Sequence, residues 1–315
     1  MHSYTLIHIL GMNPFINAQG YATTGMISVV IGAIANIVLD PLFIFMLNLG
    51  IRGAAIATVL SQCLSAGFVL YFLSKKAEYK VRLLYKEEIR TCGKDAKNIV
   101  SLGTAGFVMQ LTNSLVSICC NNVLSATGGD VYVSVMTIIS SVRQMIETPI
   151  WSISEGSSPV ISYNYGAKRP KKVIEAWITM SVLALIYSLI AWSVILFAPK
   201  FLIGIFSSDK SLMIDTVPAM KLYFSAFIFM LFQYTGQTMF KSLNKKKQAI
   251  FFSILRKVII VVPMTYMFPY VFHMGSNGVF MAEPVSNVIG GSLCFIVMLL
   301  TVLPELKQMN SDLSS

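Results

Sequence analysis

The chain has 315 residues, of which 55% are hydrophobic and only 12% are charged, with a mean hydropathy of +0.70. Soluble domains carry about 25% charged residues, so this composition cannot cover a water-facing surface and excludes a soluble enzyme. The five cysteines are an odd number, and most lie in apolar runs without metal-ligand spacing, which excludes a disulfide scaffold. The net charge of +10 raises the question of a nucleic-acid partner.

Apolar stretches along the chain are long enough to cross a bilayer as helices, which takes about 20 mostly apolar residues. The eight stretches lie at residues 26–47, 54–73, 98–124, 131–162, 173–198, 216–240, 248–272 and 278–303. Residues 1–11 are apolar but too short to cross, and they lack the basic region and cleavage site of a signal peptide. We therefore expect an all-α polytopic membrane protein with eight full spans and one partial span.

The basic residues divide unevenly between the two sides of these spans. Seventeen lie in segments 75–97, 168–172 and 241–247 and in the C-terminal tail, and four lie in the opposite loops. Because basic loops stay on the cytoplasmic side, we predict a multi-pass protein of the inner or plasma membrane with a cytoplasmic C-terminus. The positive charge indicates topology, and no nucleic-acid partner is expected.

An internal repeat relates residues 50–62 to residues 275–287 at an offset of 225, with four identical positions. In both copies a proline precedes the segment in the earlier span, at Pro41 and Pro263. An even number of spans separates the copies, which indicates a parallel repeat of the kind that transporters use. Extending the same offset predicts about 130 further residues before Met1, so we expect an N-terminally incomplete chain.

Three segments resemble motifs of the multidrug and toxic compound extrusion (MATE) transporters. The fifth and sixth helices of that family resemble NIVLDPLFIF (36–45) and the segment that follows it. The end of the eighth helix is similar to EGSSPVISYNYGAKRPKKV (155–173), and the connection between the tenth and eleventh helices is similar to GQTMFKSLNKKKQA (236–249). MATE transporters are two-lobe bundles of twelve helices, so the resemblance implies that helices 1–3 and part of helix 4 are absent.

The resemblance also divides the chain into four parts. Residues 1–74 correspond to the remainder of the N-lobe, with the end of helix 4 and helices 5 and 6. Residues 75–97 form a basic cytoplasmic loop between the lobes, residues 98–303 form the C-lobe with helices 7–12, and residues 304–315 form a cytoplasmic tail.

Asp40 is the leading candidate for ion binding, because an ionisable group inside a bilayer costs at least about 2.5–3.5 kcal/mol. Asn36 lies one turn earlier on the same face, and Pro41 removes a backbone donor and allows the helix to bend. Thr58 and Gln62 lie one turn apart on the next span and are expected to face this pair. By resemblance, Asn36, Asp40 and Thr58 match the N-lobe cation site of the family, which also uses a first-helix carboxylate that this chain lacks. The alternative is that Asp40 only ties two helices together.

Polar residues of later spans are candidates for a substrate cavity in the C-lobe. Arg143 and Glu147 lie at i, i+4; they either neutralise each other or leave Glu147 to attract a cationic substrate. Polar side chains also recur at helical spacing on two spans, at Gln110 and Asn113 and at Gln233 and Gln237. Such polar stripes usually form hydrogen bonds between helices, and lining the cavity is the alternative.

Three further charged residues, Glu283, Arg256 and Lys257, lie inside or next to apolar spans. Glu283 aligns with Thr58 in the repeat, and capping its helix near the start of the last span is as plausible as transport. Arg256 and Lys257 lie just past a basic loop, and we expect both side chains to snorkel towards it.

The resemblance implies a secondary antiporter that exports amphipathic, often cationic drugs or toxic metabolites in exchange for inward Na⁺ or H⁺. Two alternatives stay open: a non-transporting remnant of such an exporter, and a related exporter of lipid-linked saccharides. The sequence has no Ser/His/Asp grouping, phosphate loop or CxxC pattern, so no enzymatic activity is expected. We expect a monomer in the lipid bilayer, with no cofactor and no metal other than Na⁺ at Asp40.

Overall fold

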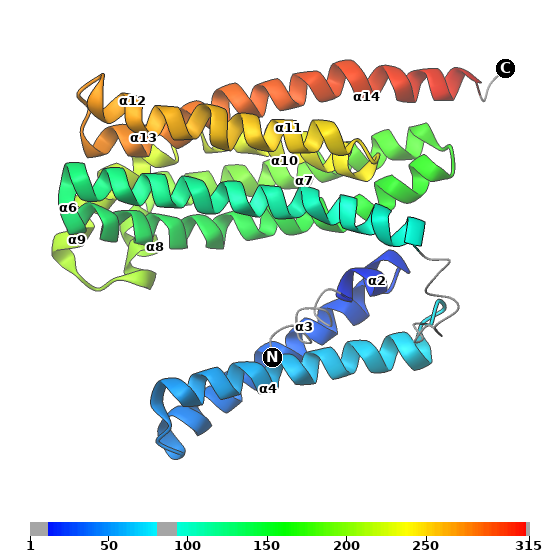
Figure 1. The fold of residues 1–315 in the computed structure, drawn as a ribbon, viewed down its shortest axis with the longest axis horizontal. Helices are drawn as coiled ribbons and strands as arrows, with labels where there is room; N and C mark the ends of the chain where they lie inside the picture. The colour runs from blue at the N-terminus through cyan, green and yellow to red at the C-terminus, as the bar shows by residue number, and fades with distance from the viewer. Residues whose placement is uncertain (1–11, 81–92, 313–315) are drawn as a thin grey trace. The chain divides into compact units, whose positions relative to one another are not determined.

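The computed structural model describes residues 12–80 and 93–312 (Figure 1). These residues form helices joined by short turns and contain no strand, which confirms the all-α class. The chain divides into two compact units, Met1–Gly93 and Lys94–Ser315. This division falls inside the segment predicted to link the two lobes.

The N-terminal unit is a helical hairpin. Its elements are α2 (Asn13–Ala18), α3 (Ala22–Pro41), the π-helical segment η1 (Leu42–Met46), α4 (Gly50–Tyr71) and the π-helical segment η2 (Phe72–Lys76). The turn between η1 and α4 uses Asn48 and Gly50, both with positive φ, which Gly adopts without strain and Asn adopts more readily than most residues. α3 and α4 therefore lie side by side (Figure 1).

Small residues allow α3 and α4 to approach closely. A Cβ atom added at Gly32 would lie 3.2 Å from Cβ of Ser65, and the Oγ atom of Ser65 donates to the carbonyl of Ser28 at 2.7 Å. The opposite face of α3 exposes large apolar side chains, including Ile37 and Val38. Close packing of small residues with an apolar outer face is typical of membrane helices.

The C-terminal unit begins with α6 (Gly93–Gly166), which is two helices rather than one. Gly129 interrupts it with φ +70° and ψ −169°, a backbone conformation that is almost restricted to glycine. The two halves lie side by side (Figure 1). α7 (Pro170–Phe197) and α8 (Pro199–Phe206) follow.

The remaining helices complete the bundle around a core of apolar side chains. They are α9 (Lys210–Tyr223), α10 (Phe227–Ser242), α11 (Lys246–Ile254), η3 (Leu255–Val261), α12 (Val262–Tyr270), α13 (Ser276–Ser286), η4 (Asn287–Gly291) and α14 (Ser292–Asp312). α9 and α10 form a bent pair with an angle of 51°. α11, η3 and α12 run on from one another without a break, as do α13, η4 and α14.

In the part of the chain that the structure describes, six helices are long and apolar enough to cross a membrane, or seven if α9 and α10 count as one span. α6 enters this number as one segment although it is broken at Gly129. The predicted number of eight is therefore not confirmed, and the predicted partial span at residues 1–11 lies outside the described residues. The chain is a multi-pass membrane protein.

Three of the π-helical segments lie next to a proline. η1 follows Pro41 directly, η3 ends two residues before Pro263, and η4 begins three residues after Pro284. Proline has no backbone N–H, so the carbonyl four residues before it loses its usual partner. For Pro263 this carbonyl belongs to Ile259, inside η3, and π-helical segments often mark functional sites. In the C-terminal unit, the π-helical segment η3 contains two buried charged residues, Arg256 and Lys257.

Candidate substrate cavity and ion site

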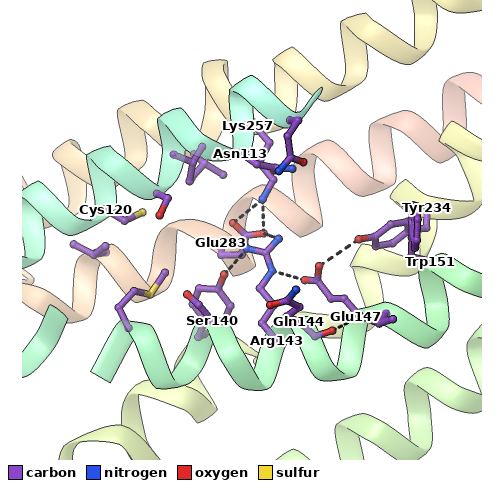
Figure 2. Close-up of a pocket in the computed structure, with 18 residues that line it drawn as sticks. Asn113, Cys120, Ser140, Arg143, Gln144, Glu147, Trp151, Tyr234, Lys257 and Glu283 are labelled. Atoms are coloured by element: carbon purple, nitrogen blue, oxygen red, sulfur yellow. Dashed lines mark hydrogen bonds and ion pairs between the residues drawn. The ribbon is translucent and has the colours of Figure 1, made fainter. Parts of the chain in front are cut away.

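A cavity of about 460 Å³ lies inside the C-terminal unit (Figure 2). Both halves of α6 contribute polar side chains to it, and the remaining walls come from α9, α10, η3 and α13. The polar and aromatic residues that line it include Gln110, Asn113, Ser117, Ser140, Gln144, Thr148, Trp151, Tyr223 and Tyr234. The cavity thus combines amide and hydroxyl groups with aromatic rings, as small-molecule sites commonly do.

Glu283 is the centre of a buried ion cluster beside this cavity. Its Oε1 atom lies 3.0 Å from Nζ of Lys257, and its Oε2 atom lies 3.4 Å from the same nitrogen. Nη1 of Arg256 is 3.6 Å and Nη2 of Arg143 is 3.8 Å from Oε1. Glu283, Lys257 and Arg256 are all buried, so one carboxylate of α13 pairs with two buried cations of η3 and with Arg143 of α6, which lines the cavity.

Arg143 also forms a second ion pair within its own helix. Its Nε atom donates to Oε1 of Glu147 at 2.5 Å, and its Nη1 atom donates to the hydroxyl of Tyr223 at 2.9 Å. The hydroxyl of Tyr234 donates to the other carboxylate oxygen, Oε2 of Glu147, at 3.2 Å. Figure 2 shows Arg143 between the two carboxylates, with both oxygens of Glu147 already engaged.

Gly290 creates the room that Arg256 occupies. A Cβ atom at Gly290 would lie 2.9 Å from Cγ and 3.0 Å from Cβ of Arg256, which is closer than atoms of this kind normally approach. Nη1 of Arg256 donates to Oδ1 of Asn287 in the same segment, η4. The absence of a side chain at Gly290 therefore lets Arg256 lie against η4 and reach both Asn287 and Glu283.

The structure corrects the expected roles of three charged residues. Arg256 and Lys257 do not snorkel to the basic loop: their side chains are only 7% and 6% exposed and pair with Glu283. Glu283 lies near the end of α13 rather than in its first turn, so it does not cap that helix. The sequence signal for this cluster was the presence of opposite charges inside separate apolar spans, which need partners.

The predicted cavity residues divide into two groups. Gln110, Asn113 and Glu147 line the cavity. Gln233 and Gln237 do not, because α10 buries both side chains against neighbouring helices. Nε2 of Gln237 lies 3.4 Å from the carbonyl of Ala249, so this residue forms the interhelical contact that was the other expectation for a polar stripe.

The predicted cation-site residues lie on α3 and α4 of the N-terminal unit. Asn36 and Asp40 are partly buried, and Nδ2 of Asn36 and Oδ1 of Asp40 have no hydrogen-bond partner among the described residues. Thr58 is exposed and donates to the carbonyl of its own helix at Ala54. Gln62 is partly buried. Within residues 12–80, no hydrogen bond joins Asp40 to Thr58 or Gln62.

Pro41 is the last residue of α3, and its φ and ψ angles of −60° and −38° are helical. The chain continues into η1, so the proline marks a change of helix type. Among residues 12–80 and 93–312, no group of three or more His, Cys, Asp and Glu side chains is arranged to hold a metal ion.

Residues 106–267, slightly more than half of the chain, match the model of the MatE family. The chain belongs to the MatE family. This confirms the predicted resemblance to multidrug and toxic compound extrusion transporters.

Curated relatives of this MatE chain are multidrug export proteins. The multidrug export protein MepA of Staphylococcus aureus (strain NCTC 8325 / PS 47) is 26% identical over 296 residues, which cover 92% of this chain and 62% of the relative. MepA of Staphylococcus haemolyticus is 25% identical over 204 residues, covering 64% of this chain and 44% of the relative. The chain therefore spans about half to two thirds of the length of these relatives.

Solved MATE structures share the fold of this chain. A MATE transporter in complex with MaL6 superposes with a TM-score of 0.85 at 23% identity, covering 97% of this chain and 68% of that one. A MATE transporter in the straight conformation gives a TM-score of 0.83 at 23% identity, covering 95% of this chain and 66% of that one.

Proposed function

We propose that this MatE chain is a secondary active antiporter, which exports amphipathic, often cationic drugs or toxic metabolites in exchange for inward Na⁺ or H⁺. Support comes from the family and from the multidrug export relatives, which match most of the chain. These relatives favour drug efflux over export of lipid-linked saccharides. The chain spans 62% of the length of MepA. Multidrug export, the activity of the whole relative, is therefore attributed to this chain as a proposal.

The cavity of about 460 Å³ is the observation that carries this function. Polar and ionised side chains inside a membrane protein are costly and usually mark a substrate or ion pathway. Here they surround a space large enough for a small molecule and flanked by Trp151 and Tyr234, whose rings suit an amphipathic guest.

We place the coupling ion at Asp40, with Asn36 beside it. Oδ1 of Asp40 is a buried acceptor without a partner in residues 12–80, and carboxylate and carbonyl oxygens are the ligands that hard cations prefer. Thr58 and Gln62 complete the site in this proposal. Binding of the ion shifts the balance between two conformations, and Pro41 and η1 supply a weakened point in the helix ladder.

We further propose that the protein lies in the cell membrane as a monomer with a cytoplasmic C-terminus. The excess of basic residues in alternate loops supports this orientation. A protease-cleavable tag after Ser315 tests it: we expect cleavage in inside-out vesicles and protection in intact cells, and the reverse pattern contradicts the orientation.

The test of the coupling site is substitution of Asp40 in reconstituted vesicles. Asp40→Asn removes the charge but keeps the shape of the side chain, so gradient-driven efflux of an amphipathic cation should fall to the background of empty vesicles. Asp130→Asn, at an exposed carboxylate of α6, is the matched control and should transport normally. Unchanged efflux in Asp40→Asn removes this residue from the mechanism.

A further inference from the structure

The ion cluster beside the cavity carries more positive than negative side chains. Three cations, Arg143, Arg256 and Lys257, surround two carboxylates, Glu147 and Glu283. No other carboxylate of the described residues forms an ion pair with these three cations. A charge that is buried without a partner is strongly unfavourable, so this cluster favours an additional negative group.

Arg143 is the arginine of the cluster that lines the cavity, and Arg256 does not line it. Lys257 also lines the cavity, but its ammonium contacts both oxygens of Glu283. The guanidinium of Arg143 has five N–H donors, of which the structure engages one at Nε and one at Nη1. Its Nη2 atom lies 3.8 Å from Glu283, which is too long for a hydrogen bond.

The position of Arg143 makes these donors accessible to a guest. Its side chain is 22% exposed, compared with 6% for Lys257 and 7% for Arg256. Arg143 lines the cavity together with the amide side chains of Gln144 and Asn113 (Figure 2). Arginine binds carboxylates through two parallel hydrogen bonds, and the amide groups supply further donors for an oxyanion.

Glu147 is poorly placed to attract a cation, although it lines the same cavity. Arg143 occupies one of its oxygens and the hydroxyl of Tyr234 occupies the other. A cationic guest would therefore meet a filled carboxylate in a cluster that is already positive. An anionic guest would meet the open donors of Arg143.

We propose that the C-lobe cavity binds the oxyanion of an amphipathic small molecule, a carboxylate in particular, with Arg143 as its direct ligand. The inference rests on the proposed efflux of amphipathic molecules and changes the charge of its substrates: those of this cavity are amphiphiles that carry a carboxylate, zwitterions included, rather than simple cations. The aromatic rings of Trp151 and Tyr234 contact the apolar part of the guest. Lys257, which also lines the cavity, and Arg256 add positive charge.

The test compares ligands that share one ring system but differ in charge. The purified chain in lipid nanodiscs is titrated with naphthylacetate, its uncharged methyl ester, naphthylmethylammonium and naphthyl phosphate, and binding is followed by calorimetry. Naphthylacetate should bind at least about tenfold more tightly than the ester and the ammonium, since hydrogen bonds to charged groups are among the strongest. Equal or tighter binding of the ammonium overturns the proposal, as does the absence of carboxylate binding, and tighter binding of the phosphate changes the preferred oxyanion.

Variants at two positions identify the ligand. Glu147→Gln removes the negative charge paired with Arg143 and should strengthen naphthylacetate binding, whereas a cation site at Glu147 would instead lose ammonium binding. The double variant Arg143→Gln/Glu147→Gln leaves the net charge unchanged and should lose the carboxylate preference. Lys200→Gln, at an exposed residue of α8, should bind as the unmodified chain does. Carboxylate preference that survives in the double variant overturns the role of Arg143.

Two controls keep the outcomes separate. The folding of each variant is checked by thermal unfolding. If the double variant does not fold, Arg143→Lys replaces it: this variant keeps the charge but loses the planar fork, so it should retain only part of the preference for carboxylates. Carboxylate binding without gradient-driven transport contradicts the proposed antiport but leaves the site standing. Transport of cations with no carboxylate preference contradicts the site but leaves the antiport standing.

Discussion

Replacing Glu283 with glutamine should destabilise the C-terminal unit strongly. Among the described residues, Glu283 is the only carboxylate that contacts Lys257 and Arg256, so its removal leaves the cluster with three cations and a single acid, Glu147. Glu283 is 4% exposed, so water screens little of this interaction. Breaking a buried ion pair by removing one partner costs about 3–5 kcal/mol.

The expected loss is large enough to measure by thermal unfolding in detergent. For a domain of this size, 1 kcal/mol shifts Tm by roughly 2–4 °C, so Glu283→Gln should lower Tm by roughly 6–20 °C. Removing the partner as well, in Lys257→Met/Glu283→Gln, returns the cluster to its original net charge and should recover part of the loss, because the ammonium left unpaired by the single change is also removed.

An exposed ion pair of the same unit gives the matched control. Lys172 and Glu175 lie 2.8 Å apart with side chains 63% and 64% exposed, and such surface pairs contribute at most about 1 kcal/mol. Glu175→Gln should therefore leave Tm nearly unchanged. If Glu283→Gln is as stable as Glu175→Gln, the cluster is not ionised as described and the reasoning fails.

Two smaller changes with one control test the packing of the C-terminal unit, and a fourth change tests the N-terminal hairpin. Gly290→Ala places a methyl group against Arg256 and should cost about 1–3 kcal/mol as an overpacked site. Gly129→Ala forces a side chain into a conformation reserved for glycine and should cost about 1–3 kcal/mol. Gly204→Ala is the control for both changes, because an added Cβ there meets nothing within 4 Å. It should be neutral or stabilising in the same unfolding assay. Ser65→Ala removes a buried hydrogen bond between α3 and α4 and should lower stability by about 1 kcal/mol; an unchanged Tm contradicts the close contact of these helices.

The fold class could be predicted from the sequence because it depends on local quantities. Apolar length and low charge give membrane helices, and the gap predicted between residues 124 and 131 contains Gly129, where α6 breaks. The number of spans is harder to predict than the fold class, because α9 and α10 bend by 51° and the two halves of α6 follow each other directly at Gly129. Helix bends depend on packing that hydropathy does not measure.

The candidate cavity could be predicted only in part. Glu147, Gln110 and Asn113 were found because their spacing places polar groups on inward faces of single helices. The contact between Lys257 and Glu283 does not follow from the residue spacing within either helix, because it joins η3 to α13. Pairing across helices depends on tertiary packing, to which Gly290 and the π-helical segments contribute.

Measuring substrate and ion movement in the same proteoliposomes tests the central claim most directly. Vesicles containing the chain are loaded with an amphipathic substrate, and Na⁺ and H⁺ fluxes are followed as the substrate leaves. The account predicts that substrate efflux is accompanied by entry of one of these ions, and that an imposed inward gradient of that ion accelerates efflux. Substrate movement without a matching flux of either ion, or no movement at all, would contradict antiport.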